Sequence, residues 1–140
     1  MSRGVKLAVW LAALAALAAV GQILTAPLST RCAMDGRRIE WIYAVTARFP
    51  DGTVKVFCSV RCAASCLAAD ERTASVEVRD QISGEPVSAE RAYFVRGRGP
   101  AGAPSGGPPY DGVHVFRDWV KALAQQEALG GELIRNPFKR

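Results

Sequence analysis

The sequence is poor in histidine and methionine. The 140-residue chain has one histidine, His114, and two methionines, Met1 and Met34. A serine or cysteine triad needs a histidine base beside its nucleophile, and no pattern in the sequence brings His114 to one. The stretch from Gly97 to Gly112 is not followed by the Lys-Ser/Thr pair of a phosphate-binding loop. The sequence therefore supports neither a catalytic triad nor a phosphate-binding loop.

Clustered positive charge is also lacking. The net charge is +5, with basic and acidic residues interspersed along the chain. A nucleic-acid-binding surface requires a basic patch or stripe, so no nucleic-acid partner is expected.

One long apolar run stands near the start of the chain. From Leu7 to Leu28 the only polar side chains are Gln22 and Thr25. As a helix this run would be roughly 33 Å long, enough to span a hydrocarbon core of about 30 Å. Arg3 and Lys6 precede the run without an acidic residue, which predicts that the N-terminus lies in the cytoplasm.

We therefore predict that residues 1–28 form a single-pass transmembrane helix in the inner membrane. Residues 29–140 would then be a soluble domain in the periplasm. A cleaved signal peptide, which would leave the domain exported, is the alternative. A lipoprotein signal is not expected, because Arg31 precedes Cys32 where a lipobox needs a small residue.

The soluble domain is predicted to be α+β, with two β-β-α-β halves and antiparallel sheets. The halves cover about residues 32–80 and 90–136. Alternating apolar runs predict strands at Glu40–Phe49, Thr53–Ser59, Ala74–Asp80, Arg91–Gly97, Val113–Phe116 and Glu132–Arg135. Helices are predicted at Val60–Asp70, with Ser59 as N-cap, and at Arg117–Gly131. The segment Ile82–Glu90 is expected to connect the halves.

The second predicted helix shows an amphipathic pattern. Its apolar residues share one face, which we expect to be buried. They are Trp119, Val120, Leu123, Ala124 and Ala128.

The sulfur-containing side chains are the strongest sign of a functional site. Cys32 and Met34 are two residues apart, so in an extended segment they would project to the same side. Thiolate and thioether together favour Cu(I), whereas a thioether is not among the usual ligands of zinc. Cys58 and Cys62 form a C-x3-C pair. The candidate metal ligands are Cys32, Met34, Cys58, Cys62, Cys66 and His114, the last as a possible nitrogen ligand.

Several interpretations of the cysteines stay open. An even number of cysteines in an external compartment is typical of two structural disulfides. Three cysteines within nine residues are crowded for ordinary disulfide geometry. Three or four cysteines could instead hold structural zinc, or Cys58 and Cys62 could form a thiol-redox pair. A scaffold that tethers a partner to the membrane is a further alternative, although a scaffold does not need a sulfur cluster.

The order of these motifs resembles that of a known family. The stretch "CAMDG…EWIYAVTARFPDGTVKVFCSVRC" resembles the first half of the NosL family, the accessory copper proteins of nitrous-oxide reductase maturation. The stretches "VRDQISGEPVSAERAYFVRGRGPAG" and "DWVKALAQQEALGGELI" are similar to later parts of the family, so the resemblance covers about residues 32 to 135. The spacing of Cys32, Cys58 and Cys62 more loosely resembles TRASH and YHS metal-binding domains.

The resemblance implies an extracytoplasmic Cu(I)-binding metallochaperone or assembly factor that is not an enzyme, with Cys32 and Met34 as ligands. Its partner would be a copper-receiving enzyme, such as nitrous-oxide reductase, or a copper transporter. The sequence departs from the family at Ala101, where the glycine loop usually carries a methionine, and at Cys62, where aspartate is common. Cys62 and Cys66 are extra thiols, and we expect them to replace the missing ligand.

Overall fold

The structure is a computed structural model that describes residues 30–72, 74–97 and 111–139. The predicted anchor over residues 1–28 and the position of Ala101 lie outside these ranges. Within them, no helix is both long enough and apolar enough to cross a membrane.

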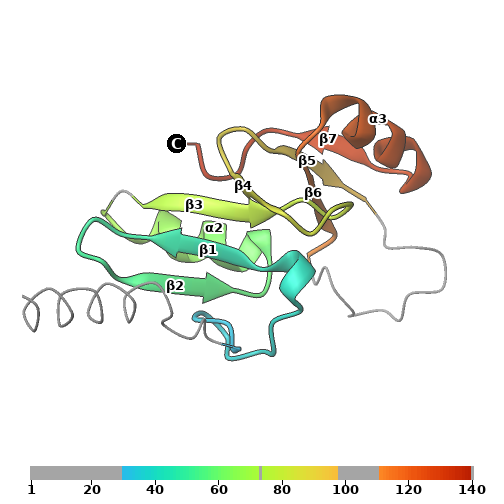
Figure 1. The fold of residues 1–140 in the computed structure, drawn as a ribbon. Coiled ribbons are helices and arrows are strands. Elements are labelled where there is room, and N and C mark those ends of the chain that lie inside the picture. The colour runs from blue at the N-terminus through green and yellow to red at the C-terminus, as the bar shows by residue number, and fades with distance from the viewer. Residues whose placement is uncertain (1–29, 73, 98–110, 140) are drawn as a thin grey trace, which may run out of the picture.

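Over the described residues the chain forms two antiparallel sheets and two α-helices, so the predicted α+β class is confirmed (Figure 1). The first sheet has the strand order β2-β1-β3-β4, and the second has the order β6-β5-β7. The strands of the first sheet are β1 (Val45–Arg48), β2 (Val54–Phe57), β3 (Ser75–Arg79) and β4 (Pro86–Ser88). Those of the second are β5 (Tyr93–Arg96), β6 (Val113–Phe116) and β7 (Glu132–Ile134).

The two sheets are built in the same way. In each, the first strand is central, its hairpin partner lies on one side, and the strand that follows a helix lies on the other. The helices are α2 (Val60–Ala68) and α3 (Trp119–Ala128). The element order is thus β-β-α-β twice, with β4 added to the edge of the first sheet.

The main core joins both sheets to α2. Phe57 and Val78 of the first sheet share this core with Phe94 and Val115 of the second. Ala63 of α2 is completely buried against it. A smaller core beneath α3 contains Val95, Phe116 and Ala122.

Two strand predictions need correction. The strand expected at Glu40–Phe49 begins only at Val45, because Trp41–Tyr43 forms a short 3-10 helix, η1. In η1, the N–H of Ala44 donates to the carbonyl of Trp41, a local bond that replaces sheet pairing. The strand Pro86–Ser88 lies within the segment expected to be a simple connection, and it pairs with β3.

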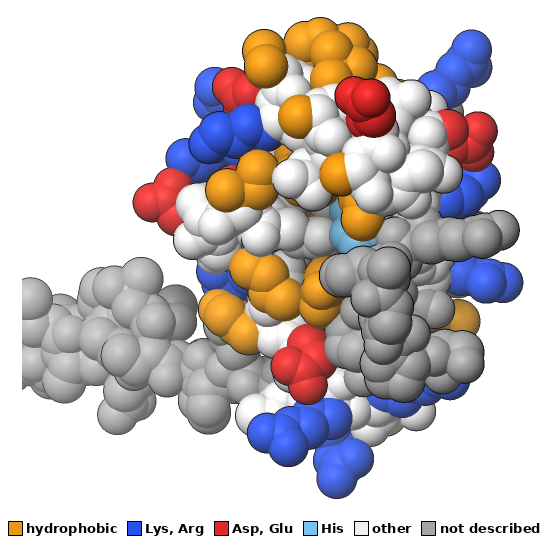
Figure 2. All heavy atoms as spheres, turned by 90° about the vertical axis from the view of Figure 1, so that its right-hand side faces the viewer, with side chains coloured by type: hydrophobic (Ala, Val, Ile, Leu, Met, Phe, Trp, Pro, Cys, Tyr) orange, Lys and Arg blue, Asp and Glu red, His pale blue; other side chains and the backbone are white. Residues whose placement is uncertain are grey.

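The apolar face predicted for the second helix is wrong. Trp119 and Val120 are 46% and 71% exposed, whereas Ala122 is fully buried. Figure 2 shows apolar side chains gathered at the upper end of the molecule, where Figure 1 places α3. The helix therefore packs through a face with a small residue at its centre and leaves its larger apolar residues on the surface.

Candidate metal centre

The segment that carries Cys32 is a turn, so the extended conformation expected for it is wrong. The N–H of Gly36 donates to the carbonyl of Cys32 at 2.9 Å, and the N–H of Cys32 donates to the carbonyl of Arg37 at 2.8 Å. Gly36 has a φ of 72°, which glycine adopts at little cost. The N–H of Ala33 donates to the carbonyl of Val56 at 2.9 Å, which fixes the turn beside the end of β2.

The second part of the site is the start of α2. Cys58 follows β2 directly, Ser59 is the N-cap, and Cys62 lies in the first turn of the helix. The hydroxyl of Ser59 accepts a hydrogen bond from the N–H of Cys62 at 3.2 Å. This cap ends the strand and starts the helix between the two cysteines, so it holds Cys58 and Cys62 near each other.

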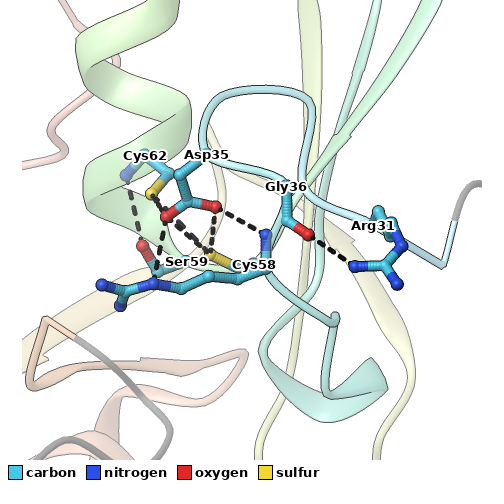
Figure 3. A network of polar contacts seen from close by, with 7 residues as sticks. Arg31, Asp35, Gly36, Cys58, Ser59 and Cys62 are labelled. Carbon is cyan, nitrogen blue, oxygen red and sulfur yellow. Dashed lines mark hydrogen bonds and ion pairs between the residues drawn. The ribbon is translucent and has the colours of Figure 1, made fainter.

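The turn and the helix start bring four side chains together. The ligand atoms of Cys32, Asp35, Cys58 and Cys62 all lie within 4.8 Å of one another. The sulfurs of Cys58 and Cys62 are 3.7 Å apart. The carboxylate of Asp35 lies 3.6 Å from the sulfur of Cys62 and 3.8 Å from that of Cys58, as Figure 3 shows. We call these four residues the thiol–carboxylate cluster.

Hydrogen bonds to its carboxylate keep Asp35 ionised. The N–H of Arg37 donates to the Asp35 carboxylate at 3.1 Å and lowers the pKa of that carboxyl below its ordinary value. The thiols of Cys32 and Cys62 and the guanidinium of Arg37 act in the same direction. Asp35 therefore presents a negative charge to the sulfurs.

The two cysteines of the helix start are held as neutral thiols. Burial raises the pKa of Cys58 well above its ordinary value, and the neighbouring Cys32 and Cys62 raise it further. Burial also raises the pKa of Cys62, and the charges of Cys32 and Asp35 act in the same direction. A metal ion that binds here must displace protons, since the thiolate is the ligand form.

The donor set suits a thiophilic ion. Three sulfurs and one carboxylate are within reach of a single ion. Sulfur donors favour Cu(I) and zinc over magnesium or calcium, which prefer oxygen. Of the predicted ligands, the structure brings Cys32, Cys58 and Cys62 together.

Met34 lies outside the cluster but on the same turn. Its side chain is 53% exposed, and it is one of the large apolar residues that the fold leaves at the surface. A hydrogen bond fixes this turn beside β2. Met34 is therefore exposed to solvent on the same turn that carries Cys32 and Asp35.

Two further predicted ligands are not members of the cluster. Cys66 is half-buried and packs against the main core. His114 is 5% exposed, and its Nδ1 lies 2.8 Å from the Oε1 of Gln81. Burial lowers the pKa of His114. All four cysteines of the chain are free thiols.

Asp35 is the member of the cluster that the sequence interpretation missed. The sequence analysis considered sulfur ligands and therefore chose Met34, the residue before Asp35. The Asp35-Gly36 pair is itself a turn signal, and a turn brings residues three apart to one side. That signal indicates Asp35 as a neighbour of Cys32.

Comparison with known proteins supports the fold. No model of a protein family matches the chain, and no curated protein matches it. A solved structure does match, that of the copper chaperone NosL from Shewanella denitrificans. The identity is 22%, the match covers 79% of this chain and 91% of that chain, and the TM-score is 0.62.

The predicted NosL-like fold is thereby confirmed. The matched protein is a copper chaperone. The looser resemblance to TRASH and YHS domains stays a prediction.

Proposed function

We propose that this protein is a Cu(I)-binding metallochaperone and that the thiol–carboxylate cluster is its metal site. The observation that carries the proposal is the meeting of three sulfurs and one carboxylate within 4.8 Å, in a chain with a NosL-like fold. Cu(I) is soft and prefers thiolates, so Cys32, Cys58 and Cys62 would be its main ligands.

Transfer would proceed by ligand exchange. Cys58 is completely buried, whereas Cys62 is partly exposed and Asp35 is at the surface. An incoming thiol, thioether or imidazole can therefore approach from the Asp35 side before the buried thiolates release the ion. Met34, more than half exposed on the same turn, offers a thioether to an arriving ion.

The remaining parts of the proposal rest on the sequence. The apolar run from Leu7 to Leu28 supports an inner-membrane anchor over residues 1–28, with the domain in the periplasm. The family resemblance supports a copper-receiving enzyme, such as nitrous-oxide reductase, or a copper transporter as partner.

Competitive titration tests the metal site. Reduced protein is titrated anaerobically with Cu(I) against a chromogenic chelator. Replacing a partner that only supports a metal ligand costs about 10- to 100-fold in affinity, so Cys32→Ser and Cys58→Ser should each cost more than about 100-fold. Cys66→Ser is the matched control, because this thiol lies outside the cluster, and it should leave the affinity within about twofold. If the Cu(I) affinity fell equally in all three variants, or in none of them, the proposed metal site would be wrong.

Structural zinc is a second candidate, favoured by Asp35. Zinc accepts thiolate and carboxylate ligands in a closed four-ligand set, and the cluster supplies three sulfurs and one carboxylate. Asp35→Asn separates the two functions. Zinc affinity would fall sharply in this variant, whereas Cu(I) held by the thiolates would be retained. Metal analysis of anaerobically purified protein identifies the ion that it carries.

A further inference from the structure

Two of the three sulfurs in the cluster are placed to form a bond with each other. The sulfurs of Cys58 and Cys62 are 3.7 Å apart, and a disulfide bond is about 2.05 Å long. Cys58 precedes the N-cap Ser59, so its backbone is not constrained by the helical hydrogen bonds of α2. The two sulfurs therefore need to approach by about 1.7 Å to form the bond.

Cys66 is less well placed than Cys58 to form a disulfide with Cys62. Both residues lie inside α2, four residues apart, where Cβ atoms are about 5–6 Å from each other. A disulfide needs Cβ atoms about 3.5–4.5 Å apart, so joining these two cysteines would require the helix to distort.

Burial gives the two cysteines of the pair different roles. Cys58 is completely buried, with 0% of its surface exposed. Cys62 is only partly buried and lies under the carboxylate of Asp35 at the surface. Cys62 is therefore the more accessible of the two to a soluble oxidant.

We propose that Cys58 and Cys62 form a redox switch of the metal site, an inference that rests on the proposed metal-binding function. The oxidant is a disulfide compound. The thiol of Cys62 gives up its proton, and its sulfur attacks one sulfur of the oxidant, breaks the S–S bond and releases one thiol. The sulfur of Cys58 then attacks the Cys62 sulfur of this mixed disulfide and releases the second thiol. The pair loses two electrons and two protons, and the oxidant gains both.

The disulfide removes two of the three sulfur ligands. Only Cys32 and Asp35 of the cluster then remain as donors. Reduced protein binds the ion, and oxidised protein releases it. Oxidation in an external compartment thus controls when the site is loaded.

The roles of the two cysteines are tested on metal-free protein. The full chain is reduced in detergent, in a Cys66→Ser background, and treated with oxidised glutathione before non-reducing peptide mass analysis. We expect a Cys58–Cys62 linked peptide. Adding Cys58→Ser should leave glutathione attached at Cys62. Adding Cys62→Ser should make the attachment of glutathione to Cys58 at least about tenfold slower than its attachment to Cys62. A disulfide that contains Cys32, or faster modification of Cys58 than of Cys62, would overturn the assigned roles.

Metal binding is then measured as a separate step. Oxidised Cys66→Ser protein should bind Cu(I) more than about 100-fold more weakly than the reduced form, and reduction should restore the affinity. Unchanged affinity after complete oxidation would overturn the switch. Failure of the reduced protein to bind Cu(I) would instead overturn the proposed function, while the linked peptide shows whether the pair itself forms.

Discussion

Cys58 is a buried thiol that stays protonated in the folded protein. Burial is the main cause of its raised pKa, and the adjacent sulfurs of Cys32 and Cys62 add to it. In the unfolded chain the same thiol ionises with a pKa of about 8.5. The folded state therefore holds a proton that the unfolded state loses at alkaline pH.

This difference predicts a loss of stability at high pH. The contribution of Cys58 is complete below about pH 8.5 and declines as the pH rises toward the raised folded value, by at most about 1.4 kcal/mol per pH unit. Urea unfolding of reduced, metal-free protein between about pH 8 and 10.5 measures the slope. Cys58→Ser should flatten it, and Cys66→Ser should keep it, because Cys58 is still present. An equal slope in Cys58→Ser would show that this thiol does not carry the effect.

At the scale of the element, α2 and α3 begin in the same way and serve different purposes. Ser59 caps α2 by accepting from the N–H of Cys62, and Asp118 caps α3 by accepting from the N–H of Lys121 at 3.0 Å. The first cap positions a member of the thiol–carboxylate cluster, whereas the second lies far along the chain from it.

The two caps form a matched pair of variants. Ser59→Ala and Asp118→Ala should each lower the free energy of unfolding by about 1 kcal/mol, the usual loss for an N-cap. Only Ser59→Ala should also weaken Cu(I) binding, because it releases the backbone of Cys62. Unfolding curves and the chelator titration together check both. A similar loss of Cu(I) affinity in Asp118→Ala would mean that general loosening, not the cap beside Cys62, governs the site.

The exposed face of α3 predicts an unusual tolerance to substitution. Val120 is 71% exposed, so Val120→Glu should change the free energy of unfolding by no more than about 0.5 kcal/mol. Ala122 is fully buried against Val95 and Phe116, so Ala122→Leu should cost about 1–3 kcal/mol through overpacking. Thermal unfolding of both variants checks which face is packed. If Val120→Glu destabilised the protein more than Ala122→Leu, the face of α3 that packs against the second sheet would be wrongly assigned.

At the scale of the whole molecule, buried polar contacts help to join the two sheets. Asp80, at the end of β3, is 5% exposed and accepts hydrogen bonds from the N–H of Arg117 at 3.2 Å and the hydroxyl of Ser83 at 2.7 Å. Burial raises the pKa of Asp80, but these hydrogen bonds outweigh burial and hold it below its ordinary value. The N–H of Gln81 donates to the carbonyl of Val115 at 3.0 Å, a second link between the sheets.

Asp80→Asn should therefore destabilise the protein by about 1–3 kcal/mol near neutral pH. Because the folded pKa is lowered, the stabilisation is present above the unfolded value of about 3.9 and is lost as the pH falls through the folded value. The variant should consequently be less sensitive to acid than the parent in urea unfolding at a series of pH values.

Glu85→Gln is the control for this prediction. Glu85 pairs with the same Arg117, at 2.7 Å, but at the surface, where side chains of the pair are 60% and 52% exposed. Such a pair contributes about 0–1 kcal/mol. If Glu85→Gln lowered the free energy of unfolding more than Asp80→Asn does, the surface pair, and not the buried Asp80, would be the main polar contact between the sheets.

Local patterns predicted most of the elements. The capped helix at Val60–Ala68 and the strand at Val113–Phe116 follow from signals within a few residues, namely an N-cap serine and a run of alternating apolar residues. The proximity of Cys58 and Cys62 is local in the same sense, since four residues of strand end and first helical turn separate them.

The sequence by itself determined the two β-β-α-β units, the sulfur-rich character of the site and the resemblance to NosL. Only the tertiary structure decided that Cys32 and Asp35 meet Cys58 and Cys62, because the hydrogen bond from Ala33 to Val56 sets the turn beside a strand more than 20 residues later. It also decided the buried face of α3, since the space above Val95 and Phe116 admits Ala122, whereas the larger apolar residues remain outside. Both outcomes depend on packing between segments distant in the chain, which periodicity within one segment does not encode.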